Sequence, residues 1–342
     1  MDTILKIFFN TLNKFKNKKF SDVNKILFVR FDNKVGDTII DSFFIRELKK
    51  FNSQIIIDII IMKPYNELLE NNPHINQIYS IPFNKRKWIK AFCLIPCLRK
   101  QKYDLIIDIP TKPTIKRLFY FYLINAKNVM STNSDGVKLV NYNICWNRNA
   151  HLSEIFVKAL NFFGLQNVDK KYELFISQKD EKFVNDFILK NKLMNKRIFV
   201  FNPKASTLSR TLNKDNIKKI LILLQKYDYS IVLLDYEEEY EEFKDISILY
   251  TSNNIMQVAA LVKQSDYVLT TDTGIVHIAD IYLKPMTILY SDVFKEGEKS
   301  RDNSYIVEWG SINPKTKMLR DKYNVNNISI DNIITILDRE IK

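Results

Sequence analysis

Residues 268–279 read Val268-Leu-Thr-Thr-Asp272-Thr273-Gly274-Ile-Val-His277-Ile-Ala, a buried-strand pattern that runs into a helix through a short Asp-Thr-Gly turn. Such a junction directs unpaired backbone N–H groups and a helix dipole at one place, which suits a phosphate. A second junction lies near the N-terminus, where Lys25-Ile-Leu-Phe-Val-Arg30 leads to Gly36-Asp37 and an amphipathic helix. Two junctions so far apart predict two α/β domains that face each other across a central cleft.

Apolar runs alternate with helical patterns along the chain. The expected strands are near-continuous Ile, Leu and Val runs, which is typical of parallel sheets covered on both faces. Strands are predicted at 25–30, 54–61, 76–81, 103–109, 127–131, 197–202, 229–235, 246–250, 266–270 and 286–290. Helices are predicted at 37–50, 64–71, 85–100, 113–124, 151–163, 213–226, 254–263 and 274–282. Residues 291–325 are expected to be irregular. The order favours two doubly wound domains over one long sheet.

The length of 342 residues also favours two domains, because a single core usually stops growing at about 250–300 residues. The predicted organisation is a basic amphipathic helix, an N-terminal Rossmann-like domain, a connecting helix, a C-terminal Rossmann-like domain and a last helix. These parts are expected at 1–20, 21–175, 176–195, 196–328 and 329–342.

The net charge of +13, from 52 Lys and Arg against 39 Asp and Glu, favours anionic partners. Part of that excess lies in residues 1–20, where a basic amphipathic helix could lie on an anionic membrane or dock on the protein's own surface. No apolar run is long enough to span a bilayer, and no signal peptide is evident. The scattered cysteines, expected to be buried structural residues, indicate a cytoplasmic protein: Cys93, Cys97 and Cys145.

Three segments could carry chemistry. Asp37 follows the first strand, and it is either a helix N-cap or a carboxylate that takes a proton from an attacking hydroxyl. In the 272–277 segment, Gly274 could allow close backbone approach to a diphosphate, while Asp272 accepts hydrogen bonds from sugar hydroxyls. The alternative is that Asp272 or Thr273 caps the helix and that His277 is structural. The third segment, Phe201-Asn-Pro-Lys204-Ala-Ser206-Thr207-Leu-Ser-Arg210, is either a solvated loop or one that neutralises a leaving diphosphate.

Several familiar motifs are absent from the chain. It has no G-x-G-x-x-G, G-x-x-x-x-G-K-[ST], H-E-x-x-H or G-x-S-x-G sequence. Dinucleotide oxidoreductases, P-loop NTPases, zinc hydrolases and α/β-hydrolases therefore lose their usual support. Basic residues are dispersed, and no nucleic-acid-binding module is evident.

Taken together, the segments resemble glycosyltransferase family 9, the lipopolysaccharide heptosyltransferases. The similarity runs from about Lys25 to Tyr290 and rests on the order and spacing of five motifs. These are Ile-Leu-Phe-Val-Arg30 with Gly36-Asp37, Pro64-Tyr-Asn-Glu-Leu-Leu-Glu-Asn-Asn-Pro73, Tyr103-Asp-Leu-Ile-Ile-Asp108, the Asn202-Pro203 loop and Asp272-Thr273-Gly274-Ile-Val-His277. One departure follows strand 229–235, where the family often has glycines and this chain has Asp235-Tyr-Glu-Glu238.

The resemblance implies a GT-B fold, with the acceptor in the N-terminal domain and the nucleotide sugar in the C-terminal one. It implies inverting, metal-independent transfer of heptose from ADP-heptose to Kdo or heptose of the lipopolysaccharide or lipooligosaccharide inner core, with no cofactor. Asp37 matches the general base. The expected donor-binding residues are Lys204, Ser206, Thr207, Arg210, Asp272, Thr273, Gly274 and His277, and the expected acceptor-binding residues are Arg30, Asp32 and Lys34.

A lipid A-core acceptor places the predicted enzyme at the inner face of the bacterial inner membrane, as a peripheral cytoplasmic protein held by residues 1–20. Other readings stay open. The donor could be another nucleotide sugar, or the chain could be a GT-B sugar-nucleotide epimerase. From a different class, it could be a non-catalytic scaffold at the membrane.

Overall fold

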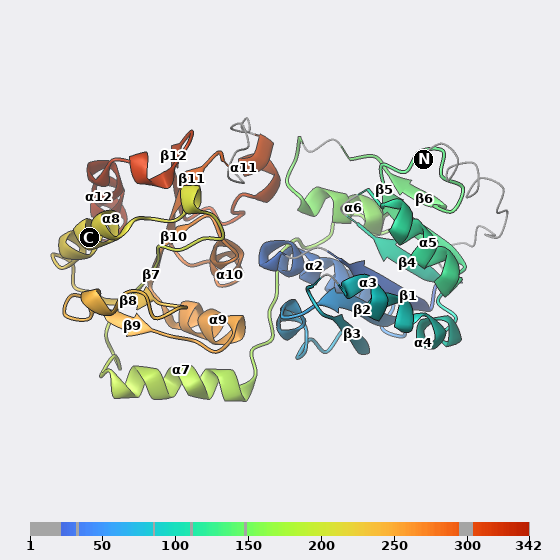
Figure 1. Ribbon diagram of the computed structural model, residues 1–342, viewed down its shortest axis with the longest axis horizontal. Coiled ribbons are helices and arrows are strands. Elements are labelled where there is room, and N and C mark those ends of the chain that lie inside the picture. Colours follow the sequence, from blue (N-terminus) through green and yellow to red (C-terminus); the bar gives the residue numbers. More distant parts are fainter. Residues whose placement is uncertain are drawn as a thin grey trace. The chain divides into compact units, whose positions relative to one another are not determined.

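The structure is a computed structural model that describes residues 22–31, 34–84, 86–109, 112–146, 149–293 and 304–341. The basic helix predicted at 1–20 and the predicted acceptor ligand Asp32 lie outside these residues. The chain divides into two compact units, Met1–Leu174 and Phe175–Lys342, and each is described by itself (Figure 1). No helix among the described residues combines the length and apolar character needed to cross a bilayer.

The first unit contains a six-stranded parallel sheet. Its strands are β1 (Lys25–Arg30), β2 (Ile56–Met62), β3 (Gln77–Ile81), β4 (Leu105–Asp108), β5 (Asn128–Thr132) and β6 (Tyr142–Ile144). Its helices are α2 (Val35–Phe51), the 3-10 turn η2 (Tyr65–Leu68), α3 (Lys87–Cys93), α4 (Ile95–Lys100), α5 (Ile115–Ile124) and α6 (Ser153–Asn161).

Helices cover both faces of this sheet, which explains why its central strands are apolar without alternation. On one face, Phe28 of β1 packs against Phe44 of α2 and Phe156 of α6. On the other face, Leu27 and Val29 share a buried cluster with residues of α4 and α5, including Leu98 and Phe121.

The second unit repeats the plan. Its strands are β7 (Ile198–Asn202), β8 (Ser230–Leu234), β9 (Ile248–Tyr250), β10 (Tyr267–Thr271), β11 (Met286–Ser291) and β12 (Thr316–Asp321). Its helical elements are α7 (Gln178–Lys190), η3 (Leu208–Arg210), α8 (Lys214–Leu224), η4 (Glu241–Phe243), α9 (Ile255–Gln264), α10 (Ile275–Ile281), α11 (Ser304–Trp309), η5 (Val325–Asn327) and α12 (Ile330–Glu340). The core joins Phe199 and Phe201 of β7 to Ile220 of α8 and Leu337 of α12. Helix α7 lies along α9, where Lys263 pairs with Glu181.

Both sheets have the same strand order. The first runs β3-β2-β1-β4-β5-β6, and the second runs β12-β11-β10-β7-β8-β9, which is the same sequence of steps counted from β7. The order reverses between β1 and β4 in one unit and between β7 and β10 in the other. Open α/β sheets bind their ligands beyond the carboxyl ends of the strands at this reversal. The prediction of an α/β class with two doubly wound sheets is therefore confirmed.

Some local predictions were wrong. Residues 291–325 contain β12, whose sequence Thr-Lys-Met-Leu-Arg-Asp is too polar to read as a strand but suits a sheet edge. The helix predicted over 85–100 is two short helices that meet at Leu94, because Pro96 lacks the N–H that a continuous helix needs. Residues 65–68 form only a 3-10 turn, and β6 was missed because it has three residues.

Candidate active site

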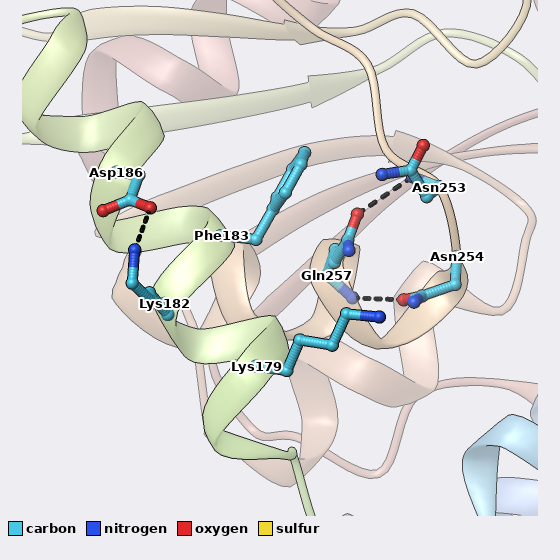
Figure 2. A pocket seen from close by; sticks show the side chains of 7 residues that line it. All are labelled: Lys179, Lys182, Phe183, Asp186, Asn253, Asn254 and Gln257. Carbon is cyan, nitrogen blue, oxygen red and sulfur yellow. Dashed lines mark hydrogen bonds and ion pairs between the residues drawn. The ribbon is translucent and has the colours of Figure 1, made fainter.

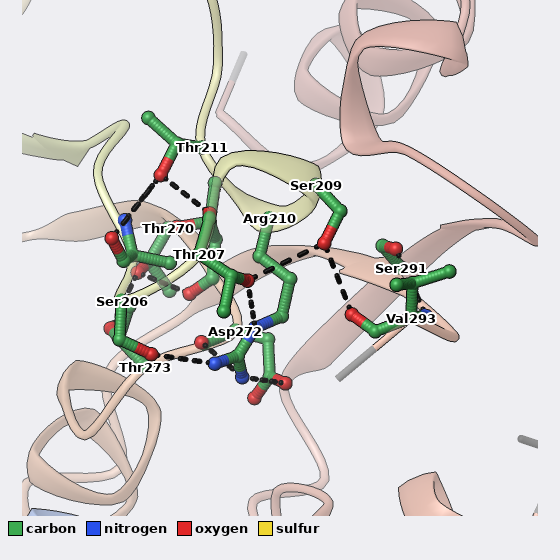
Figure 3. A network of polar contacts seen from close by, with 12 residues as sticks. Ser206, Thr207, Ser209, Arg210, Thr211, Thr270, Asp272, Thr273, Ser291 and Val293 are labelled. Carbon is green, nitrogen blue, oxygen red and sulfur yellow. Dashed lines mark hydrogen bonds and ion pairs between the residues drawn. The ribbon is translucent and has the colours of Figure 1, made fainter. Parts of the chain in front are cut away.

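Arg210 organises the predicted donor loop of the second unit (Figure 3). It lies in η3, is 6% exposed, and its Nη1 donates to Asp272 Oδ2 at 2.9 Å. Its Nε donates to Thr207 Oγ1 at 3.1 Å, and its Nη2 donates to Ser206 Oγ at 2.8 Å. Two segments more than sixty positions apart in the sequence thus meet beyond the carboxyl ends of β7 and β10, as their adjacent strands require. The four side chains were each predicted to bind the donor.

Lys204 is held by the acidic turn that follows β8. Its Nζ donates to Glu237 Oε2 at 2.7 Å and to Glu239 Oε2 at 2.6 Å. Asp235 is buried and shapes the turn by accepting the backbone N–H groups of Glu239 and Tyr240. Burial opposes the charge on Lys204, but its hydrogen bonds to Glu237 and Glu239 outweigh burial and raise its pKa.

The Asp-Thr-Gly turn leads into α10, a helix of seven residues. Gly274 has φ −59° and ψ −17°, an ordinary right-handed conformation, so the backbone geometry does not itself demand glycine here. Gly274 is the N-cap of α10 and makes no side-chain capping bond, so the alternative that Asp272 or Thr273 caps the helix is wrong. Thr273 Oγ1 accepts the N–H of Ile275 at 3.3 Å from the position before the cap. No hydrogen bond from the N–H groups of Thr273 and Gly274 is found within the described residues, which leaves these two N–H groups open to a ligand.

His277 lies deeper in the second unit, at 5% exposure. Its Nδ1 is 3.7 Å from Asp280 Oδ2, and Asp280 is held by Ser311 Oγ and by the N–H of Ile312. This buried position is consistent with a structural role for His277 beside the Asp-Thr-Gly turn. Contact between His277 and a donor stays a prediction.

The two cations predicted to receive a diphosphate are already compensated. Lys204 pairs with Glu237 and Glu239, and Arg210 pairs with Asp272, so two cations face three carboxylates. A diphosphate entering this loop must compete with carboxylates for Lys204. The uncharged hydrogen-bond donors of the site, which are its hydroxyl groups and open N–H groups, therefore become more important for binding the anion.

In the first unit, Asp37 is the third residue of α2 and is 4% exposed. The helix begins with Lys34 as N-cap, which makes no side-chain capping bond, so the alternative reading of Asp37 as N-cap is wrong. Lys34 Nζ lies 4.0 Å from Asp37 Oδ2. Position 37 follows β1 at the strand reversal, where α/β sheets place ligand-binding groups.

The predicted acceptor ligands are placed differently. Lys34 is the more exposed of them, with 40% of its side chain accessible. Arg30 is 1% exposed, with Nε 2.7 Å from Asp41 Oδ2 and Nη1 donating to the carbonyl of Ile109 at 3.2 Å. Its guanidinium is thus used to join β1, α2 and the end of β4, and contact with an acceptor stays a prediction.

Two polar residues at the strand reversals lie in the quoted motifs but were given no role from the sequence. Asn202, the last residue of β7, is fully buried and donates to Thr270 Oγ1 and Thr273 Oγ1. Asp108, the last residue of β4, is fully buried and pairs with Arg117 in the first turn of α5. The available signal was a polar residue closing an apolar strand, which both positions show.

Other polar features lie elsewhere. A groove between α7 and the start of α9 is lined by Lys179, Phe183 and Gln257, and it contains none of the predicted site residues (Figure 2). The three cysteines are exposed, which corrects the expectation of burial, and Cys93 and Cys97 lie on separate helices. Among the described residues, no three His, Cys, Asp or Glu side chains are grouped so that they could hold a metal ion.

Comparison with known proteins places these sites in a family. The family model of glycosyltransferase family 9 (heptosyltransferase) matches residues 92–319, which include the donor loop and the Asp-Thr-Gly turn but not Asp37. The lipopolysaccharide core heptosyltransferase OpsX of Haemophilus influenzae is 23% identical over 288 residues, covering 80% of each chain.

Solved structures share the fold. A family 9 glycosyltransferase from Veillonella parvula has a TM-score of 0.79 at 15% identity, covering 96% of this chain and 99% of its own. The Escherichia coli ADP-heptose lipopolysaccharide heptosyltransferase II has a TM-score of 0.71 at 17% identity, covering 93% and 98%. The two parallel sheets therefore form a GT-B fold. The chain is a glycosyltransferase and belongs to glycosyltransferase family 9, the heptosyltransferase family.

Proposed function

We propose that this glycosyltransferase moves heptose from ADP-heptose to a sugar of the lipopolysaccharide inner core, with inversion at the anomeric carbon. The donor is proposed because the similar Escherichia coli enzyme is an ADP-heptose heptosyltransferase. The acceptor is proposed because the similar Haemophilus influenzae protein is a lipopolysaccharide core heptosyltransferase. The observation that carries the proposal is the network of Arg210, Ser206, Thr207 and Asp272 at the strand reversal of the second sheet.

In the proposed reaction, the carboxylate of Asp37 takes the proton from an acceptor hydroxyl as its oxygen attacks the anomeric carbon of the donor. The new carbon–oxygen bond forms while the bond to the diphosphate breaks, and its electron pair leaves on the diphosphate. A single displacement of this kind inverts the anomeric centre. Proton removal by a positioned carboxylate contributes about 10²–10⁴-fold to such reactions.

The departing diphosphate must be stabilised by groups of the protein. We assign this role to the hydroxyl groups of Ser206, Thr207 and Thr273 and to the open N–H groups of Thr273 and Gly274. Lys204 adds its charge when the diphosphate displaces the carboxylates of Glu237 and Glu239. Arg210 fixes the loop, and its charge is shared with Asp272.

The substitution Asp37→Asn tests the proposal. The amide that it introduces keeps the size of the side chain but cannot accept a proton, so the rate of transfer should fall by about 10²–10⁴-fold. Transfer is measured as acceptor-dependent release of ADP from ADP-heptose. Because Asp37 lies in the other unit from the donor loop, the affinity for ADP should stay unchanged.

Two controls accompany this test. The thermal unfolding temperature of Asp37→Asn, compared with wild type, shows whether the variant is folded. Calorimetry with ADP shows whether the donor site is intact. A folded variant that keeps more than about a tenth of the wild-type rate would remove Asp37 as the general base.

A further inference from the structure

We infer that Asn202 is a positioning residue of the donor site, which holds the Thr273 hydroxyl so that its proton is presented to an anionic oxygen of a nucleoside diphosphate. The inference rests on the proposed function, because it assumes that a diphosphate occupies the second unit. It assigns a role to a side chain that closes β7 at the strand reversal.

The contacts of Asn202 cross from one strand to the next. Its side chain is fully buried at the end of β7. Its Nδ2 donates to Thr270 Oγ1 at 2.9 Å and to Thr273 Oγ1 at 3.1 Å, two groups of the neighbouring β10 segment that Figure 3 also shows. One amide nitrogen has two protons, so both are used in these bonds. Asn202 therefore ties the end of β7 to the turn that precedes α10.

The hydrogen-bond inventory of Thr273 then determines where its proton can go. A threonine hydroxyl has one donor proton and two acceptor lone pairs. Thr273 Oγ1 accepts from Asn202 Nδ2 and also from the N–H of Ile275 at 3.3 Å, so both lone pairs are occupied. The hydroxyl keeps its proton as its one remaining hydrogen-bonding function.

That proton has no good acceptor inside the described part of the second unit. The hydroxyl group that comes nearest is Thr270 Oγ1, at 3.4 Å, well beyond the usual O–H···O distance of about 2.7–2.8 Å. Thr270 already accepts from Asn202 and donates its own proton to the carbonyl of Thr271 at 2.8 Å. Thr273 is partly exposed, so a ligand can reach it. A phosphate oxygen would give the Thr273 hydroxyl a short, charge-assisted bond.

The compensated cations of the loop make this donor important. Lys204 and Arg210 are both paired with carboxylates, so neutral donors carry more of the binding of the anion. An acceptor in place of the Asn202 nitrogen would draw the Thr273 proton inward, away from the ligand. The orientation of the amide is therefore the specific feature on which the inference depends. The other amide atom, Oδ1, is buried without a hydrogen-bond partner among the described residues.

A double-mutant cycle on nucleotide binding tests the inference. The full-length wild type, Asn202→Ala, Thr273→Val and the double variant are titrated with ADP and with UDP by calorimetry. Loss of one charge-assisted hydrogen bond should weaken binding of the preferred nucleotide by about tenfold in each single variant. Because Asn202 acts through the Thr273 hydroxyl, the double variant should be within about twofold of Thr273→Val alone.

Asn128→Ala is the matched control. Asn128 is also a fully buried asparagine, and its Oδ1 likewise has no hydrogen-bond partner in the part of the chain that the structure describes, but it lies at the amino end of β5 in the first unit. Its loss should lower the unfolding temperature without changing the affinity for nucleotide. If Asn202→Ala gives no cooperative unfolding transition, Asn202→Ser replaces it in the cycle, since the serine hydroxyl is one bond shorter and cannot bridge both threonines.

The outcomes separate this inference from the proposed function. If the wild type binds neither ADP nor UDP, the proposed function fails and the inference fails with it. If the wild type binds and the position-202 variant binds equally well, only the inference is overturned. A double variant weakened by about 100-fold, the product of two independent tenfold losses, would also overturn it, because Asn202 would then act separately from Thr273.

Discussion

At the residue scale, the ion pair between Arg210 and Asp272 is almost entirely shielded from solvent. The two side chains are 7% and 10% exposed, and the guanidinium also bonds Ser206 and Thr207. Removing one member of such a pair leaves a buried charge without compensation, which is far more costly than losing a pair at the surface. The donor loop therefore depends on this pair for its shape as well as for its charge.

We expect Arg210→Met to lower the free energy of unfolding of the second unit by about 3–5 kcal/mol, measured by urea denaturation. Lys214→Met is the matched control, because Lys214 pairs with Glu242 in the same unit with both side chains about half exposed. The control should change the free energy of unfolding by less than about 1 kcal/mol. Equal effects of the two substitutions would mean that the Arg210 pair is hydrated rather than buried.

The donor site also shows what single residues could and could not reveal. Arg210, Ser206, Thr207 and Asp272 could be grouped from the sequence, because each segment directly follows a predicted buried strand. The capture of Lys204 by Glu237 and Glu239 could not be foreseen. It depends on the pairing of β7 with β8 and on a turn in which Glu238 has φ +56°. Neither feature has a recognisable sequence pattern.

At the element scale, Asp104 joins the amino ends of three strands of the first sheet. Its Oδ2 accepts the N–H groups of Asn24 and Lys25 where β1 begins, and its Oδ1 contacts Lys127 just before β5. Burial alone would raise the pKa of Asp104, but the hydrogen bonds from Lys127, Asn24 and Lys25 outweigh burial and hold the pKa below its ordinary value. The ionised carboxylate is thus the form that stabilises the sheet.

The sign of the pH dependence follows from this depressed pKa. The stabilisation should be fully present above the unfolded-state pKa of about 3.9 and should be lost as pH falls through the folded-state value. Asp104→Asn should therefore lower the free energy of unfolding by about 1.5–3 kcal/mol at pH 7 and by much less at pH 2. Urea denaturation at the two pH values measures this difference. Asp135→Asn, at an exposed carboxylate of the same unit, should show no such change, and a pH-independent loss in Asp104→Asn would contradict the assignment.

The edges of the sheets mark the limit of prediction from pattern. Central strands such as β1 and β10 were placed within about one residue, because continuous burial demands continuous apolar sequence. The edge strand β12, Thr-Lys-Met-Leu-Arg-Asp, has only two apolar residues and three charged ones, which an edge tolerates, and so it resembles a loop in the sequence. The sequence predicted doubly wound sheets but not the order of their strands, because more than one order is common in such sheets; the strand order is a finding of the structure.

At the scale of the whole molecule, the chain consists of two compact units, and each has the sheet and the hydrophobic core of a separate domain. Each unit has its own six-stranded sheet and its own buried cluster, centred on β1 and β4 in one and on β7 and β10 in the other. Helix α7, which connects the units in sequence, packs within the second unit on α9 through Glu181 and Lys263. Domains with a complete core of this size generally fold alone.

We therefore expect the fragment Phe175–Lys342, expressed alone, to unfold in one cooperative transition. Because the residues proposed to bind the diphosphate all lie in this unit, the fragment should bind ADP within about threefold of the full chain, well inside the roughly tenfold that one lost charge-assisted hydrogen bond costs. It should transfer no sugar, because Asp37 is missing. Denaturation followed by circular dichroism and calorimetry with ADP check the two halves of this prediction. A folded fragment that no longer binds ADP, beside a full chain that does, would mean that residues before Phe175 complete the donor site.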